Sequence, residues 1–139
     1  MGVSPRGGRT GRIQSWRDLR VMVVDDNPNF RTLMRTVFRA IGVRNLQVVD
    51  NAMEGLARLS QRPTDIVFCD WAMDNMNGVE FTRLLREFND RSKVILLTGY
   101  SMDVMREKAA DSGVDDFLEK PVSARSLMQS VSNVMAFPN

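Results

Sequence analysis

The chain has 139 residues, of which 43% are hydrophobic and 26% are charged, and its formal net charge is +2. This length favours one domain with its own core, and no apolar run reaches the roughly 18 residues of a membrane span. Histidine is absent, which excludes serine–histidine and cysteine–histidine catalysis, and the single cysteine, Cys69, excludes an internal disulfide. One unpaired cysteine fits a cytoplasmic protein, and the basic N-terminus lacks the apolar region of a secretory signal.

The positive charge is concentrated at the start of the chain. The first 17 residues hold four arginines and no acidic residue, and they are rich in glycine without hydrophobic periodicity. We therefore predict a flexible basic tail over residues 1–17 and a folded domain over residues 18–139. A basic tail can contact nucleic acid or acidic surfaces, but we interpret this one as a solvated arm.

Short apolar runs alternate with stretches in which apolar residues recur three or four positions apart. The runs predict strands, and the longer spacing predicts amphipathic helices. In chain order, we predict a strand over 20–25, a helix over 28–41, a strand over 46–49, a helix from Ala52 that ends before Pro63, a strand over 65–70, a helix from Val79 to Phe88, a strand over 93–98, a helix from Met102 to a stop at Gly113, a strand over 115–119 and a helix over 123–136.

Five strands that alternate with five helices predict an α/β fold with a parallel sheet. The strands at 20–25, 65–70 and 93–98 are almost wholly apolar, which is typical of central strands covered on both faces. The strands at 46–49 and 115–119 are flanked by more polar residues, so we expect them at the edges. We therefore predict a flavodoxin-like, doubly wound, five-stranded parallel sheet in the order 2-1-3-4-5.

Four of the predicted strands lead into polar residues. The first ends in Asp25 and Asp26, the third in Asp70, the fourth in Thr98, and the fifth leads into Lys120. Because ligands bind outside the carboxyl ends of the strands in open α/β sheets, we expect these side chains to share one rim.

The carboxylates of this rim are candidates for a cation site. Three clustered carboxylates repel one another unless a cation lies among them, and ligation by oxygen alone suits Mg²⁺. Such a site would also make Asp70 a nucleophile. The alternative is that Asp26 only caps the following helix and Asp70 only begins a loop. Asp50 also ends a strand, but an edge strand, so we expect it to lie away from the crevice.

These motifs resemble the receiver domain of two-component response regulators, and above all the single-domain chemotaxis-regulator type. The resemblance covers residues 19–136, and its motifs occur in the order and spacing of that family. They are Asp25-Asp26, the segment from Asp70 to Gly78, Leu97-Thr98-Gly99 and Lys120-Pro121.

The resemblance implies that Asp70 is a phosphoacceptor, phosphorylated by a histidine kinase or a histidine phosphotransfer protein. It also implies a Mg²⁺ site formed by the side chains of Asp26 and Asp70, by Asp25 mostly through water, and by the backbone carbonyl of Ala72. Lys120 would pair with a phosphoryl oxygen.

The resemblance further implies a switch. Thr98 would bind another phosphoryl oxygen, and Phe117 would move into the space that Thr98 vacates. The alternative for Phe117 is a simple core residue. Lys120-Pro121 would hold a cis peptide bond. Asp74 departs from the family pattern, because proline is usual at that position.

The implied function is that of a stand-alone regulator that signals by contact with a downstream protein target, as yet unidentified, without a DNA-binding domain or a membrane span. It would catalyse only its own phosphorylation and dephosphorylation. One alternative function is that of a Mg²⁺-dependent phosphatase of the haloacid-dehalogenase type. Such enzymes use a second acidic residue two positions after the nucleophile, and Ala72 occupies that position here. Another is a degenerate receiver that binds partners without phosphate, against which the intact motifs argue.

Overall fold

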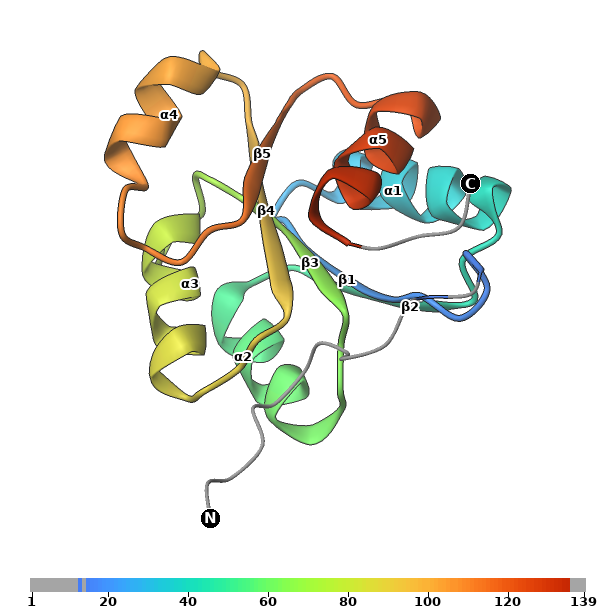
Figure 1. Ribbon diagram of the computed structural model, residues 1–139, viewed down its shortest axis with the longest axis horizontal. Coiled ribbons are helices and arrows are strands. Elements are labelled where there is room, and N and C mark those ends of the chain that lie inside the picture. Colours follow the sequence, from blue (N-terminus) through green and yellow to red (C-terminus); the bar gives the residue numbers. More distant parts are fainter. Residues whose placement is uncertain (1–12, 14, 136–139) are drawn as a thin grey trace.

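Parallel strands form the centre of the fold, and each is followed by a helix (Figure 1). The structure is a computed structural model that describes residue 13 and residues 15–135. None of the helices in this described part is long and apolar enough to cross a membrane. The elements are β1 (Arg20–Val24), α1 (Pro28–Ile41), β2 (Asn45–Val49), α2 (Ala52–Gln61), β3 (Ile66–Asp70), α3 (Gly78–Glu87), β4 (Lys93–Thr98), α4 (Met102–Lys108), β5 (Asp116–Glu119) and α5 (Ala124–Val134).

The strand order is β2-β1-β3-β4-β5, and every pair is parallel. This confirms the predicted sheet, including its order and its edge strands. The register sets Val24 opposite Cys69, and Asp70 opposite Leu97. The carboxyl ends of β1, β3 and β4 therefore meet at one edge of the sheet.

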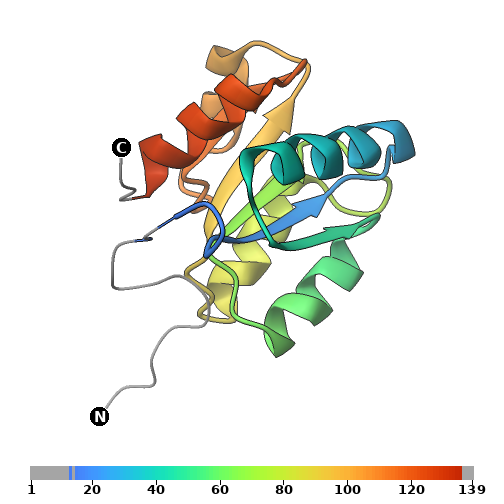
Figure 2. The ribbon, with the colours of Figure 1, turned by 90° about the vertical axis from the view of Figure 1, so that its right-hand side faces the viewer.

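Helices cover both faces of the sheet (Figure 2). Side chains alternate along β1: Val21 and Val23 belong to a buried cluster with residues of α1 and α5, whereas Met22 and Val24 belong to a cluster with residues of α2 and α3. A strand in the middle of the sheet thus buries both of its faces, which explains why the central strands are continuous apolar runs.

Each helix follows a loop at the carboxyl edge of the sheet, and polar caps fix the starts of the two helices that follow β1 and β3. The side chain of Asn27 accepts hydrogen bonds from the first backbone N–H groups of α1. Asn77 and Glu80 form a reciprocal capping box at the start of α3. Such caps satisfy backbone donors that have no partner within the helix, so they fix where the two loops enter their helices.

The prediction for the fourth helix was wrong at its end. α4 stops at Lys108, well before Gly113. The intervening residues form turns, in which Asp111 has a φ of 62° and Gly113 a φ of 91°. The Ser112 hydroxyl donates to the carbonyl of Ala109 at 2.6 Å. A short polar side chain that bonds the backbone locally competes with helical hydrogen bonding.

The domain includes residues that the prediction assigned to the basic tail. Ile13 is 1% exposed and lies in the core cluster beside α1 and α5, and Trp16 packs against the same cluster. Packing on the domain therefore starts before residue 18. Of the flexible tail predicted for residues 1–17, residues 1–12 and 14 lie outside the described residues.

Candidate functional site

Three carboxylates meet at the carboxyl ends of β1 and β3. Oxygen atoms of Asp25, Asp26 and Asp70, one from each residue, all lie within 4.8 Å of one another. Asp25 is fully buried, Asp70 is half-buried and Asp26 is exposed. The parallel register of β1 and β3 produces this cluster, because it aligns the ends of the two strands.

Lys120 reaches the same cluster from the end of β5. Its Nζ lies 3.1 Å from Oδ2 of Asp25 and 3.6 Å from Oδ1 of Asp70. Its backbone N–H donates to the carbonyl of Thr98 at 2.7 Å, and its peptide bond to Pro121 is cis. Three carboxylates and one contacting ammonium leave this part of the described structure with an excess of negative charge.

The excess charge acts on the ionisation of Asp70. Burial, first, and the neighbouring Asp25, second, raise its pKa to about 6. The Lys120 ammonium and the backbone N–H of Ala72 oppose this shift but do not cancel it, and Asp26 adds to it slightly. A carboxylate in such surroundings ionises more readily once a cation binds beside it.

The donor set fits a hard divalent cation. Carboxylate oxygens are the ligands that Mg²⁺ prefers, and this ion usually keeps several waters. The exposure of Asp26 leaves one side of the cluster open to solvent, as such waters require. Ala72 is an exposed residue of the adjoining loop, and the role of its carbonyl stays a prediction.

Thr98 is the last residue of β4, one position after Leu97, which pairs with Asp70 across the sheet. It is 1% exposed, and its hydroxyl oxygen accepts a hydrogen bond from the backbone N–H of Tyr100 at 2.9 Å. A Cβ on Gly99 would meet nothing within 4 Å, so there is open space at that position. Tyr100 is 63% exposed. Phe117 is half-buried and packs against the cluster that β4 shares with α3, and its role as a switch stays a prediction.

The sequence analysis missed a steric role for Gly78, the first residue of α3. A Cβ at this position would lie 2.8 Å from the carbonyl oxygen of Asp70 and 2.6 Å from Cδ2 of Leu96. Its N–H donates to the carbonyl of Trp71 at 2.9 Å. Glycine therefore lets α3 begin directly against the end of β3. The sequence signal was a glycine directly before the predicted helix, which was expected to begin at Val79.

Asp50 lies outside the predicted site but near one of its members. It is not one of the three clustered carboxylates, but it lines a cavity of about 210 Å³ together with Asp26 and Asp74. The loops after β1, β2 and β3 all contribute to this cavity, since they leave the same edge of the sheet. Asp50 therefore shares this cavity with Asp26, but it stays outside the carboxylate cluster, as predicted.

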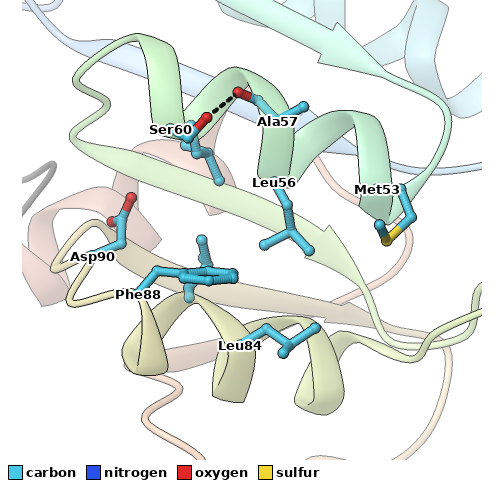
Figure 3. Close-up of a pocket in the computed structure, with 9 residues that line it drawn as sticks. Met53, Leu56, Ala57, Ser60, Leu84, Phe88 and Asp90 are labelled. Carbon is cyan, nitrogen blue, oxygen red and sulfur yellow. Dashed lines mark hydrogen bonds between the residues drawn. The ribbon is translucent and has the colours of Figure 1, made fainter.

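A larger cavity, of about 600 Å³, lies between α2 and α3 (Figure 3). Its walls are mainly apolar and include Met53, Leu56, Leu84 and Phe88. Asp90 also lines it, but its carboxylate accepts the backbone N–H of Ser92 at 2.8 Å. The described walls thus bring no group of titratable side chains together, so the chemistry belongs to the rim.

A profile of the response regulator receiver domain matches residues 21–132. The sensor histidine kinase GacS of Pseudomonas protegens is 33% identical over an alignment of 136 positions, which covers 93% of this chain but only 15% of that kinase. The chemotaxis protein CheY-3 of Vibrio cholerae is 24% identical over 120 residues, which are 85% of this chain and 92% of that protein. The solved structure of chemotaxis protein CheY4 of Vibrio cholerae shares the fold, with a TM-score of 0.77, 21% identity, and coverage of 84% and 98% of the two chains.

Proposed function

The chain belongs to the response regulator receiver domain family, and from that premise we propose that Asp70 accepts a phosphoryl group from a histidine kinase or a histidine phosphotransfer protein. The observation that carries this proposal is the arrangement at the rim. Three carboxylates lie within 4.8 Å of one another, and an ammonium stands 3.6 Å from Asp70. Asp70 is the member of the cluster with intermediate exposure, so a phosphoryl donor can reach it.

In the proposed step, a carboxylate oxygen of Asp70 attacks the phosphorus of a phosphohistidine. A P–O bond forms, the P–N bond breaks, and its electron pair leaves on the imidazole nitrogen of the donor. Lys120 neutralises charge on a phosphoryl oxygen, which its position between Asp25 and Asp70 supports. The chain thereby catalyses only its own phosphorylation and, with water as the attacking group, its own dephosphorylation.

Mg²⁺ would neutralise phosphoryl oxygens during the transfer, which depends mainly on positioning and charge. The residues that would hold it are Asp25, Asp26, Asp70 and the carbonyl of Ala72. Both oxygens of Asp25 already have partners, because Oδ1 accepts the N–H of Asn27 at 2.8 Å and Oδ2 faces Lys120. This fits a contribution through water, whereas the exposed Asp26 is available for direct ligation.

We propose that phosphorylation changes a protein-binding surface through Thr98 and Phe117. The Thr98 hydroxyl would leave the N–H of Tyr100 and bind a phosphoryl oxygen, and Phe117 would repack on β5. The likeness to a chemotaxis protein over 92% of that protein's length supports a stand-alone regulator. We propose that it is cytoplasmic and that its output is contact with another protein.

Acetyl phosphate tests the proposal against its main rival. With Mg²⁺, the chain should accumulate one phosphoryl group per molecule, as measured by intact mass, and chelation of the metal should prevent this. A phosphatase would instead release many equivalents of inorganic phosphate per molecule, and that result would contradict the proposal.

A further inference from the structure

The Lys120 ammonium lies against an aromatic ring as well as against carboxylates. Its Nζ is 4.2 Å from the centroid of the Phe30 ring. This distance is within the range of about 6 Å in which a cation is attracted to the face of an aromatic ring. The contact joins the first turn of α1 to the end of β5, two elements that are distant in the sequence.

The position of Phe30 is fixed from two sides. Its backbone N–H donates to Oδ1 of Asn27 at 3.1 Å, as part of the cap of α1. Its side chain is half-buried and packs against the core cluster that α1 shares with α5. The next residue, Arg31, donates from Nη1 to the carbonyl oxygen of Asp25 at 2.9 Å. One helical turn therefore contacts both the backbone of a carboxylate residue and the ammonium.

The ring and the carboxylates act on the ammonium in different ways. A hydrogen bond to Asp25 has a preferred direction, whereas attraction to a ring face tolerates small displacements of the cation. An aliphatic side chain in the same place would remove water from the ammonium without attracting it. The ring can therefore hold the ammonium at the rim and still let it shift toward an arriving phosphoryl oxygen.

We propose that Phe30 is a positioning residue that holds the Lys120 ammonium where it meets the phosphoryl group on Asp70. This inference rests on the proposed function, because it assigns a role within that phosphoryl transfer. The positioning role can be distinguished from the role of Phe30 in core packing. Packing needs only apolar volume, whereas attraction to the ammonium needs an aromatic face.

The test compares Phe30→Leu, which keeps an apolar side chain, with Phe30→Tyr, which keeps the ring. The rate of phosphorylation by acetyl phosphate with Mg²⁺ should fall about 3- to 10-fold in Phe30→Leu and stay within about twofold in Phe30→Tyr. Urea unfolding verifies that each variant is folded at the assay temperature. Equal rates in all three proteins would overturn the inference.

The same substitution in a Lys120→Met background separates positioning from packing. Without the ammonium, Phe30→Leu should change the slow residual rate less than about twofold, because there is no cation for the ring to hold. An equal loss in both backgrounds would show that the ring acts through the core, and would overturn the inference.

Two further outcomes keep this inference distinct from the proposed function. If the unsubstituted protein takes no label, the proposed function fails and the inference falls with it. If it takes label, NMR provides a direct measurement of the contact. The ε-methylene protons of Lys120 should be shifted upfield by the ring and lose this shift in Phe30→Leu; an unshifted signal in the unsubstituted protein would overturn the inference alone.

Discussion

The carboxylates at the two ends of the sheet have opposite surroundings. At the amino end, Asp65 is fully buried and binds the Arg20 guanidinium in bidentate fashion, at 2.8 and 3.1 Å, and it also accepts the Arg20 backbone N–H. At the carboxyl end, Asp25, Asp26 and Asp70 gather around Lys120. Carboxylate and cation are matched at the first end, whereas negative charge is in excess at the second.

This difference separates an ion pair that stabilises the fold from a group of carboxylates that is available to bind a cation. A buried carboxylate with a matched guanidinium needs nothing further from outside, because its hydrogen bonds are made within the protein. Asp70, whose pKa is raised to about 6, is most easily ionised when a cation arrives. The ion pair at the amino end therefore contributes to folding stability, whereas the excess negative charge at the carboxyl end favours the binding of a cation.

Removal of the ion pair between Arg20 and Asp65 should cause the largest loss of stability. Asp65→Ala should lower the free energy of unfolding by about 3 kcal/mol, because it leaves the Arg20 guanidinium and its backbone N–H without this acceptor. Urea unfolding at neutral pH measures the loss. Glu54→Ala is the control, since it removes an exposed ion pair with Arg58 and should cost less than about 1 kcal/mol. Equal losses in the two variants would contradict the comparison.

A side-chain atom added at Gly78, at the carboxyl end of the sheet, should cause the next largest loss of stability. Gly78→Ala should lower the free energy of unfolding by about 2 kcal/mol, because its Cβ would press on the backbone of Asp70 and on Leu96. The same unfolding measurement applies. Gly99→Ala is the matched control, since a Cβ there meets open space. If Gly78→Ala and the control had equal free energies of unfolding, α3 would be able to move away from the end of β3 at no cost, which would contradict this prediction.

Removing charge from the carboxyl end should stabilise the protein. When folding raises the pKa of an acid, the protein is most stable at a pH below the pKa that this acid has in the unfolded chain. This stability is lost as the pH rises through the pKa that the acid has in the folded protein. Asp70→Asn should therefore match the unsubstituted protein near pH 4. With chelator present, it should become more stable by about 1–2 kcal/mol as the pH passes about 6. A difference that does not depend on pH would contradict this.

The smallest effect should come from a side chain beside the rim. Tyr100 is 63% exposed and follows Thr98 by two residues, so it can partly cover a phosphoryl group on Asp70. Tyr100→Ala should shorten the phosphoryl lifetime roughly twofold, which corresponds to well under 1 kcal/mol in activation free energy. The decay of intact phosphoprotein measures this lifetime. An unchanged lifetime would show that the phenol does not shield the group.

Strand-end positions were predictable from the sequence because they follow from periodicity. Apolar runs ending in Asp25, Asp70 and Thr98 indicated both the strands and their shared edge, and the sheet order followed from which runs were purely apolar. The end of α4 was mispredicted because hydrogen bonds of the Ser112 side chain in the following turn compete with helical hydrogen bonding.

Contacts between distant segments were not predictable in the same way. The pair of Arg20 with Asp65 and the contact of Phe30 with Lys120 depend on how helices and strands dock in three dimensions. Ile13 was assigned to the tail because its neighbours are polar and rich in glycine, yet it is buried in the core. The cavity that Asp50 shares with Asp26 was not predictable either, because strand order says little about where a loop turns.

The phosphorylation site is the central claim, and locating the phosphoryl group tests it most directly. The unsubstituted protein, Asp70→Asn and Asp50→Asn should be incubated with acetyl phosphate and Mg²⁺, and their intact masses compared. Asp50→Asn is the matched control, because it removes a carboxylate that lies beside the site but outside the cluster. The account predicts one phosphoryl group on the unsubstituted protein and on Asp50→Asn, and none on Asp70→Asn. Label that persists in Asp70→Asn would contradict it.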